Sequence, residues 1–160
     1  MAKTMVIDFI VQGKPQGKGR HRSAVTSSGK LRTYTPQKTV RYEKDIAQAF
    51  RIEACSRRLV WPLDRVYHLR VIAYFPVPKS WTKARKQRAY NRELHPTVVP
   101  DGDNILKAVA DGLNGLAWQD DRQVTFQEVK KMYVKEYMVP CIHVYITTID
   151  AAPEEPEQRR

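Results

Sequence analysis

Apolar residues along this chain recur with two different periods, which separate predicted strands from predicted helices. Continuous β-branched and apolar runs indicate buried strands, whereas apolar positions three and four residues apart indicate amphipathic helices. Proline and glycine mark the ends of most segments. The pattern predicts strands over residues 5–11, 65–75, 122–134 and 139–149, and helices that begin near residues 36, 81 and 104.

Capping residues set the expected helix boundaries. Thr35 as N-cap and Pro36 at the first position predict a helix that runs to about residue 57. Ser80 is the expected cap of a short helix over residues 81–92. The third helix follows Asp103, and its expected buried side carries Ile105, Leu106, Val109, Leu113 and Leu116.

These elements predict a mixed α/β (α+β) fold, a single small domain with a mixed β-sheet flanked by helices. The last two strands are expected to form a hairpin, because only a short break near Glu136 and Pro140 separates them. A chain of 160 residues is long enough to bury one core. We expect the domain to span residues 1–150 and the Pro/Glu-rich tail, residues 151–160, to be disordered.

Between the first strand and the first helix, glycine, proline and serine interrupt any periodicity over residues 13–35. This composition predicts a long mobile loop. The loop is strongly basic, and residues 13–41 include no acidic residue. A second basic stretch, residues 79–92, reaches no acidic residue until Glu93.

The overall charge agrees with these local runs. The chain has 28 Lys and Arg against 17 Asp and Glu, a formal net charge of +11, which favours a polyanionic partner such as nucleic acid. Tyr34 and Trp81 are candidates for stacking on unpaired bases, and Trp118 is expected in the core. The candidate DNA-binding residues are Lys14, Lys18, Arg20, Arg22, Lys30, Arg32, Lys79, Lys83, Arg85 and Lys86.

Other features narrow the class of protein. Cys55 and Cys141 are too few for a disulfide framework or a cysteine-type zinc site, and both are expected to be reduced core residues. His68 and His143 lie in predicted strands and are expected to be packed side chains. We recognise no signal peptide and no apolar run long enough to cross a bilayer, so we expect a cytoplasmic protein.

An acidic segment interrupts this basic chain. Residues 100–124 contain only two basic residues but five aspartates, which are Asp101, Asp103, Asp111, Asp120 and Asp121. Carboxylates gathered beside basic stretches would oppose phosphate binding unless a cation offsets their charge. Mg²⁺ prefers a few carboxylates together with water and phosphate oxygens. The segment is therefore a candidate site for one or two Mg²⁺ ions.

Spacing supports this hypothesis. Asp101 and Asp103 can converge if their stretch is extended, and Lys107 lies one helical turn beyond Asp103. A turn after the helix could return Asp120 and Asp121 to the same place. Such ions would activate water for phosphodiester hydrolysis. Alternatively, the first pair caps a helix and the second pair forms a turn. Asp111 is expected to be an exposed helix residue outside the site.

The spacing closely resembles the signature of the RusA-type crossover-junction endonucleases. The upstream likeness is looser and includes Gly13-Lys14-Pro15, the helix after Pro36 and Pro78-Lys79-Ser80-Trp81. The matching string is Asp101-x-Asp103-Asn104-x-x-Lys107-x-x-x-Asp111-x-Leu113, followed by Gly115, Trp118, Asp120-Asp121 and Gln123-Val124.

This resemblance implies a homodimer that cleaves Holliday junctions with Mg²⁺ or Mn²⁺ and is often prophage-encoded. Its essential residues correspond to Asp101, Asp103, Lys107 and Asp121, with Asp120 as an additional metal ligand. Gly102 replaces a residue that is often larger in the family, which is expected to loosen this approach. Two alternatives stay open: a non-catalytic DNA-binding protein, or a nuclease acting on other branched or duplex DNA.

Overall fold

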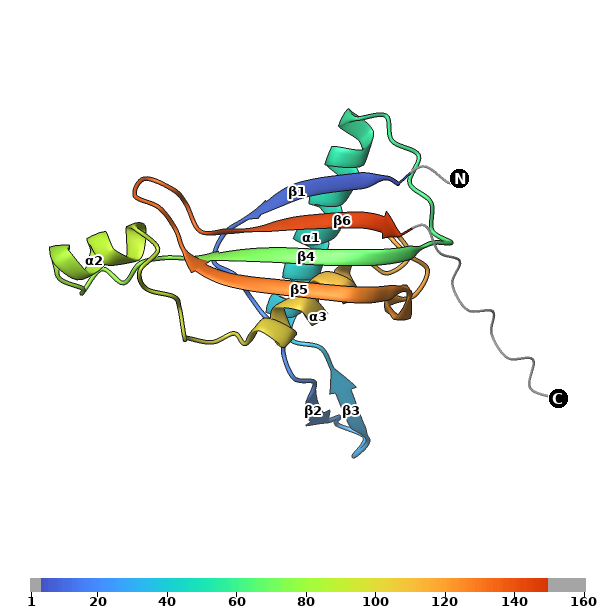
Figure 1. Cartoon of the computed structure of the whole chain (residues 1–160). Coiled ribbons are helices and arrows are strands. Elements are labelled where there is room, and N and C mark those ends of the chain that lie inside the picture. Colours follow the sequence, from blue (N-terminus) through green and yellow to red (C-terminus); the bar gives the residue numbers. More distant parts are fainter. Residues whose placement is uncertain (1–3, 150–160) are drawn as a thin grey trace.

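The computed structural model describes residues 4–149, which form one four-stranded sheet, a separate two-stranded hairpin and three α-helices (Figure 1). The expected mixed α+β fold is confirmed, while the predicted tail, residues 151–160, lies outside the described residues. The main strands are β1 (Val6–Gln12), β4 (Val66–Phe75), β5 (Val124–Tyr133) and β6 (Cys141–Ile149).

The order of the strands in the sheet is β1-β6-β4-β5. Strand β6 pairs antiparallel with both β1 and β4, whereas β5 pairs parallel with β4 at the edge. The expected hairpin of the last two strands is therefore wrong, because β4 lies between them. Burial explains the choice: Ile142, Val144 and Ile146 of β6 are fully buried, while half of the residues of β5 are exposed and suit an edge.

Two helices cover one face of this sheet. They are α1 (Gln37–Ser56) and α3 (Gly102–Leu113), which pack against each other on the same side of the strands (Figure 1). Ile46 and Phe50 of α1 and Val109 of α3 are among the residues that close the core. The helix α2 (Lys83–Tyr90) lies apart, beyond one end of the sheet (Figure 1).

Three expected helix boundaries shift by a few residues. The N-cap of α1 is Pro36 rather than Thr35, whose hydroxyl lies 3.3 Å from His21 Nδ1. The N-cap of α2 is Thr82 rather than Ser80, and its side chain accepts a hydrogen bond from the Arg85 backbone. Because α3 ends at Leu113, Leu116 lies outside the helix.

The segment predicted as an irregular loop contains a β-hairpin that projects from the body (Figure 1). Its strands are β2 (Arg22–Val25) and β3 (Leu31–Tyr34), and all eight residues are exposed. Gly29 has a φ of 74° in the connecting turn, a conformation that favours glycine. The structure of this segment therefore comes from the pairing of β2 with β3, because neither strand is buried against the core.

The cysteine expectation holds for only one residue. Cys141 is buried in β6, but Cys55 is exposed near the end of α1, so it is not a core residue. His143 is half-buried, as expected for a packed strand residue, and its Nε2 lies 3.0 Å from Asp8 Oδ2. Trp118 is fully buried, and its indole N–H donates to the Ala110 carbonyl at 3.3 Å. The predicted core position of Trp118 is confirmed.

Candidate active site

The first turn of α3 presents two exposed carboxylates. Asp101 is the N-cap, with an extended backbone and no side-chain capping hydrogen bond, and Asp103 lies in the first helical turn. Within residues 4–149, neither side chain takes part in a hydrogen bond or an ion pair. We expected residues 101–103 to form an extended stretch. Only Asp101 has an extended backbone, and Asp103 is already helical, so the two carboxylates are not brought together in the expected way. Their oxygens stay available to a ligand, and the capping alternative lacks its defining bond.

Gly102 fixes this turn against the sheet instead of loosening it. A Cβ atom built at this position would lie 2.7 Å from Val129 Cγ1 of β5, closer than normal packing allows. A larger residue would force the helix start away from the strand. The glycine therefore allows the first turn of α3 to pack closely on Val129 in the middle of β5, contrary to the expected loosening.

Lys107 follows one turn after Asp103 on α3, and its side chain is exposed. Residues four apart lie on the same face of a helix, so the ammonium group belongs to the same surface as the carboxylates. Among the described residues, no carboxylate forms an ion pair with Lys107. The first two turns of α3 thus combine two free carboxylates with a free cation.

The Asp120-Asp121 pair has two different environments. Asp120 caps the 3₁₀ helix η1 (Asp121–Gln123) by accepting from the Arg122 backbone at 3.0 Å. The Arg122 side chain donates to the same carboxylate at 2.8 Å. These hydrogen bonds from Arg122 lower the pKa of Asp120 to about 2. Asp120 is therefore already paired, whereas the half-buried Asp121 side chain has no ion-pair partner in the described chain.

A single protomer does not bring Asp121 to the other two carboxylates. Gly102 packs on Val129, five residues beyond Val124 at the start of β5, which corresponds to roughly 16 Å at ~3.3 Å per residue. Asp121 lies just before Val124. Within residues 4–149, no three His, Cys, Asp or Glu side chains are grouped closely enough to hold a metal ion. The expected return of Asp120 and Asp121 beside Asp101 does not occur within one chain.

Lys18, which we expected to contact DNA, is held by two carboxylates. Its ammonium lies 2.5 Å from Glu43 Oε1 of α1 and 2.7 Å from Asp111 Oδ2 of α3. Burial would lower the pKa of Lys18, but its hydrogen bonds to Asp111 and Glu43 outweigh that effect and raise it. The expectation that Asp111 is exposed is wrong, because its side chain is only 22% exposed. The sequence contained no signal for this cluster, whose members are far apart along the chain.

We expect Lys18→Met to lower the free energy of unfolding by about 1–3 kcal/mol, between the values typical of exposed and buried ion pairs. The substitution leaves Glu43 and Asp111 facing each other, half-buried and without a cation. Urea unfolding followed by circular dichroism measures the change. Lys14→Met is the matched control, because Lys14 is exposed and outside the ion pairs of the described residues. Equal stability of the two variants would contradict a structural role for Lys18.

The remaining basic candidates lie on or beside two projecting elements, the β2–β3 hairpin and α2 (Figure 1). Arg22, Lys30 and Arg32 are exposed on the hairpin or its turn, and α2 exposes Lys83 and Arg85 beyond one end of the sheet. Lys86 is half-buried on α2, while Lys14, Arg20 and Lys79 are exposed beside these elements. The molecule therefore has two separate basic surfaces.

The two aromatic candidates for base stacking differ in availability. Trp81 is half-buried, with its ring 5.3 Å from that of Tyr133 and the Arg85 guanidinium 3.9 Å from its centroid. Both neighbours compete with a base for this ring. Tyr34 on β3 is 48% exposed. Tyr34 is consequently the better placed of the two.

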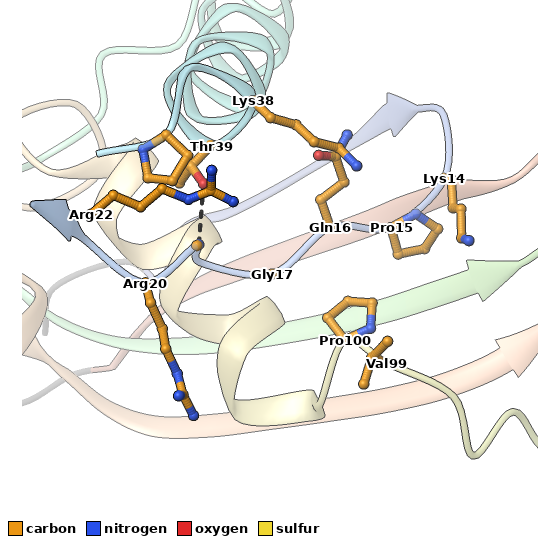
Figure 2. Close-up of a pocket in the computed structure, with 12 residues that line it drawn as sticks. Lys14, Pro15, Gln16, Gly17, Arg20, Arg22, Lys38, Thr39, Val99 and Pro100 are labelled. Atoms are coloured by element: carbon orange, nitrogen blue, oxygen red, sulfur yellow. Dashed lines mark hydrogen bonds between the residues drawn. The ribbon is translucent and has the colours of Figure 1, made fainter. Parts of the chain in front are cut away.

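A pocket that the sequence did not reveal lies between the base of the hairpin and the turn before α3 (Figure 2). Its volume is about 540 Å³, and twelve residues line it. Pro100 is one of them and directly precedes Asp101. The only hint in the sequence is the pair Gly17 and Gly19, which allows close backbone packing here.

Free carboxylates and a lysine on one helix, between two basic surfaces, are typical of an enzyme that acts on nucleic-acid phosphates. Comparison with known proteins agrees: the family model described as Endodeoxyribonuclease RusA matches residues 12–147. The chain belongs to this family of DNA endonucleases. It is also 33% identical to the uncharacterized protein YqaN of Bacillus subtilis strain 168 over 147 residues, which covers 91% of this chain and 98% of that protein. No helix within the described residues is both long and apolar enough to span a membrane.

Proposed function

We propose that this protein is a divalent-metal-dependent endonuclease that resolves Holliday junctions by paired phosphodiester hydrolysis. The observation that carries the proposal is the first part of α3, where Asp101 and Asp103 have no side-chain partner among residues 4–149 and Lys107 lies one turn further. The family supports endonuclease activity on DNA. The two basic surfaces are suited to phosphates on more than one arm of a branched substrate.

The chemistry of the paired carboxylates fits Mg²⁺, with Mn²⁺ as a substitute. Asp101 and Asp103 offer exposed oxygen ligands that form no ion pair with any cation of the described chain, and Mg²⁺ binds through one or two carboxylates, water and phosphate. When bound, such an ion activates water and polarises the phosphate. Asp120 is a weaker candidate ligand than we expected, because Arg122 already occupies its carboxylate.

Asp121 has a place in this proposal only if two copies of the chain combine. Along β5, Val129, on which Gly102 packs, lies roughly 16 Å from Val124 at ~3.3 Å per residue, and Asp121 lies before Val124. Strand β5 is an edge strand, and a two-fold arrangement of two such edges runs them in opposite directions. That arrangement can carry Asp121 of one copy toward Asp101 and Asp103 of the other. We therefore propose a homodimer in which each site draws carboxylates from both chains.

The test is incubation of the purified protein with a synthetic four-way junction and with linear duplex, in Mg²⁺, Mn²⁺ or EDTA. We expect paired, symmetric nicks in the junction with either metal and none in EDTA. Junction binding without cleavage in any metal would instead indicate a binding protein. Equal cutting of the linear duplex would leave an endonuclease without preference for branched DNA.

Lys107→Ala is expected to slow junction cleavage by roughly 10²-fold, with little loss of affinity, because a cation that stabilises charge developing in the transition state affects rate more than binding. Single-turnover cleavage gives the rate, and a gel-shift titration in EDTA gives the affinity. Lys44→Ala, an exposed lysine on α1, is the control. A loss of affinity with an unchanged rate would make Lys107 a DNA-contact residue instead.

A further inference from the structure

The pocket beside the carboxylate pair has the size of a small-molecule site. Its volume of about 540 Å³ lies within the ~300–1,000 Å³ typical of ligand pockets, which is much more than one phosphate group needs. Pro100 forms part of its wall and is the residue before Asp101. A strand whose phosphate lies at Asp101 and Asp103 would therefore pass the pocket within a nucleotide or so.

Among residues 4–149, the polar part of the lining is entirely positive or neutral, and no acidic residue of this part of the chain lines the pocket. Its four cationic side chains are exposed, and in the described structure none of them forms an ion pair. Such unpaired cations favour phosphate oxygens. They are Lys14, Arg20, Arg22 and Lys38.

The apolar part of the lining includes three proline rings and a valine. Pro15 comes from the loop, Pro36 from the start of α1, and Val99 and Pro100 from the turn before α3 (Figure 2). Val99 is 76% exposed and is therefore accessible to a ligand in the pocket. Rings without hydrogen-bonding groups suit the flat face of a base, and they do so without selecting its identity.

The backbone of the pocket is held by close contacts. A Cβ atom at Gly17 would lie 2.8 Å from Pro100 Cβ, and one at Gly19 would lie 2.5 Å from Thr39 Oγ1. The Gly19 N–H donates to Thr39 Oγ1 at 3.1 Å, drawn dashed in Figure 2. The Lys18 N–H donates to the Asn104 carbonyl of α3 at 2.9 Å. These contacts join the loop to both helices, so the pocket is formed before any DNA binds.

We propose that this pocket binds one unstacked nucleotide of the DNA, adjacent to the phosphate presented to Asp101 and Asp103. The cations hold its phosphate and the proline rings contact its base. This inference rests on the proposed function of the protein as a DNA endonuclease. Removing a nucleotide from a duplex costs stacking and pairing energy, and the cost is least where pairing is already disrupted. The pocket thus favours branch points over continuous duplex without reading sequence.

The test uses four-way junctions that carry the fluorescent base 2-aminopurine at each nucleotide around the branch point in turn. Its fluorescence rises when the base leaves the stack. Titration in EDTA separates binding from cleavage. We expect a several-fold rise at one or two positions with the wild-type protein. Junction binding without a rise at any position would overturn the proposal.

A matched pair of variants assigns the rise to the pocket. Val99→Trp adds bulk at a residue that lines the pocket, whereas Val98→Trp adds the same bulk at its exposed neighbour, which is not part of the lining. We expect Val99→Trp to lose most of the fluorescence rise and Val98→Trp to keep it. Identical behaviour of the two variants, with both folded by circular dichroism, would contradict the assignment.

Binding of thymidine 5′-monophosphate separates this proposal from the proposed enzymatic function. Calorimetry should show at least ten-fold tighter binding of the nucleotide than of inorganic phosphate or thymidine, and a loss of this preference in Val99→Trp. Absence of that preference would overturn the proposed nucleotide binding by the pocket, even if the protein cleaves junctions. Nucleotide binding by a protein that neither binds nor cuts junctions would support the pocket and refute the junction-resolving function.

Discussion

Asp103→Asn is expected to reduce junction cleavage by roughly 10²–10³-fold while junction affinity stays the same or increases. Loss of one carboxylate removes a metal ligand, and metal stabilisation of the transition state amounts to several kcal/mol, with each ~1.4 kcal/mol equal to ten-fold in rate. Affinity does not fall, because the change also removes a negative charge that repels phosphate. Single-turnover cleavage in Mg²⁺ and gel-shift titration in EDTA measure the two effects.

The control for this prediction is Asp45→Asn, which removes the same charge from an exposed position on α1. It should leave the cleavage rate within about two-fold, since an exposed charge far from a site is largely screened by salt. If Asp103→Asn abolished binding together with cleavage and lowered the unfolding temperature, Asp103 would have a structural role. The absence of any hydrogen bond to its side chain within the described residues argues against that outcome.

The sequence could predict the elements that depend on burial. Leu69 and Val71 of β4 and Ile105 and Val109 of α3 are buried, as their apolar periods indicated. Local periodicity could not predict the order of the strands. It identifies β5 and β6 as strands but carries no information about which strands pair with them. The hairpin β2–β3 was missed for a related reason: all its residues are exposed, so no hydrophobic period marks it.

The candidate site was only partly accessible from the sequence. Asp101, Asp103 and Lys107 are neighbours because all three lie at the start of one helix, and their spacing sets their distance. Asp121 lies before β5, whose later residue Val129 packs against Gly102, so the separation depends on the packing of α3 along β5 and not on the motif spacing. Lys18 resembled its basic neighbours in the sequence. Its pairing with Glu43 and Asp111 depends on the packing of α1 against α3.

Mixing two inactive variants should restore nicking if each site uses carboxylates from both chains. Asp103→Asn and Asp121→Asn proteins are each expected to lose cleavage when assayed alone. In a mixed dimer, one site carries both substitutions, while the other combines an intact Asp101 and Asp103 from one chain with an intact Asp121 from its partner. Random assortment in a two-fold dimer then leaves about a quarter of the wild-type number of sites intact.

The cleavage products distinguish sites shared between two chains from sites that are each built within one chain. A mixed dimer with a single intact site nicks one strand of a four-way junction and leaves the opposite strand uncut, so nicked junctions accumulate and resolved duplexes do not. Sites built within one chain would each contain one substitution in the mixed dimer, and mixing would restore nothing. Mixing Asp103→Asn with Asp101→Asn is the internal control, since both residues come from the same end of α3. Each site takes Asp101 and Asp103 from the same chain, so every site in that mixture lacks one of these two carboxylates. No nicking should therefore return.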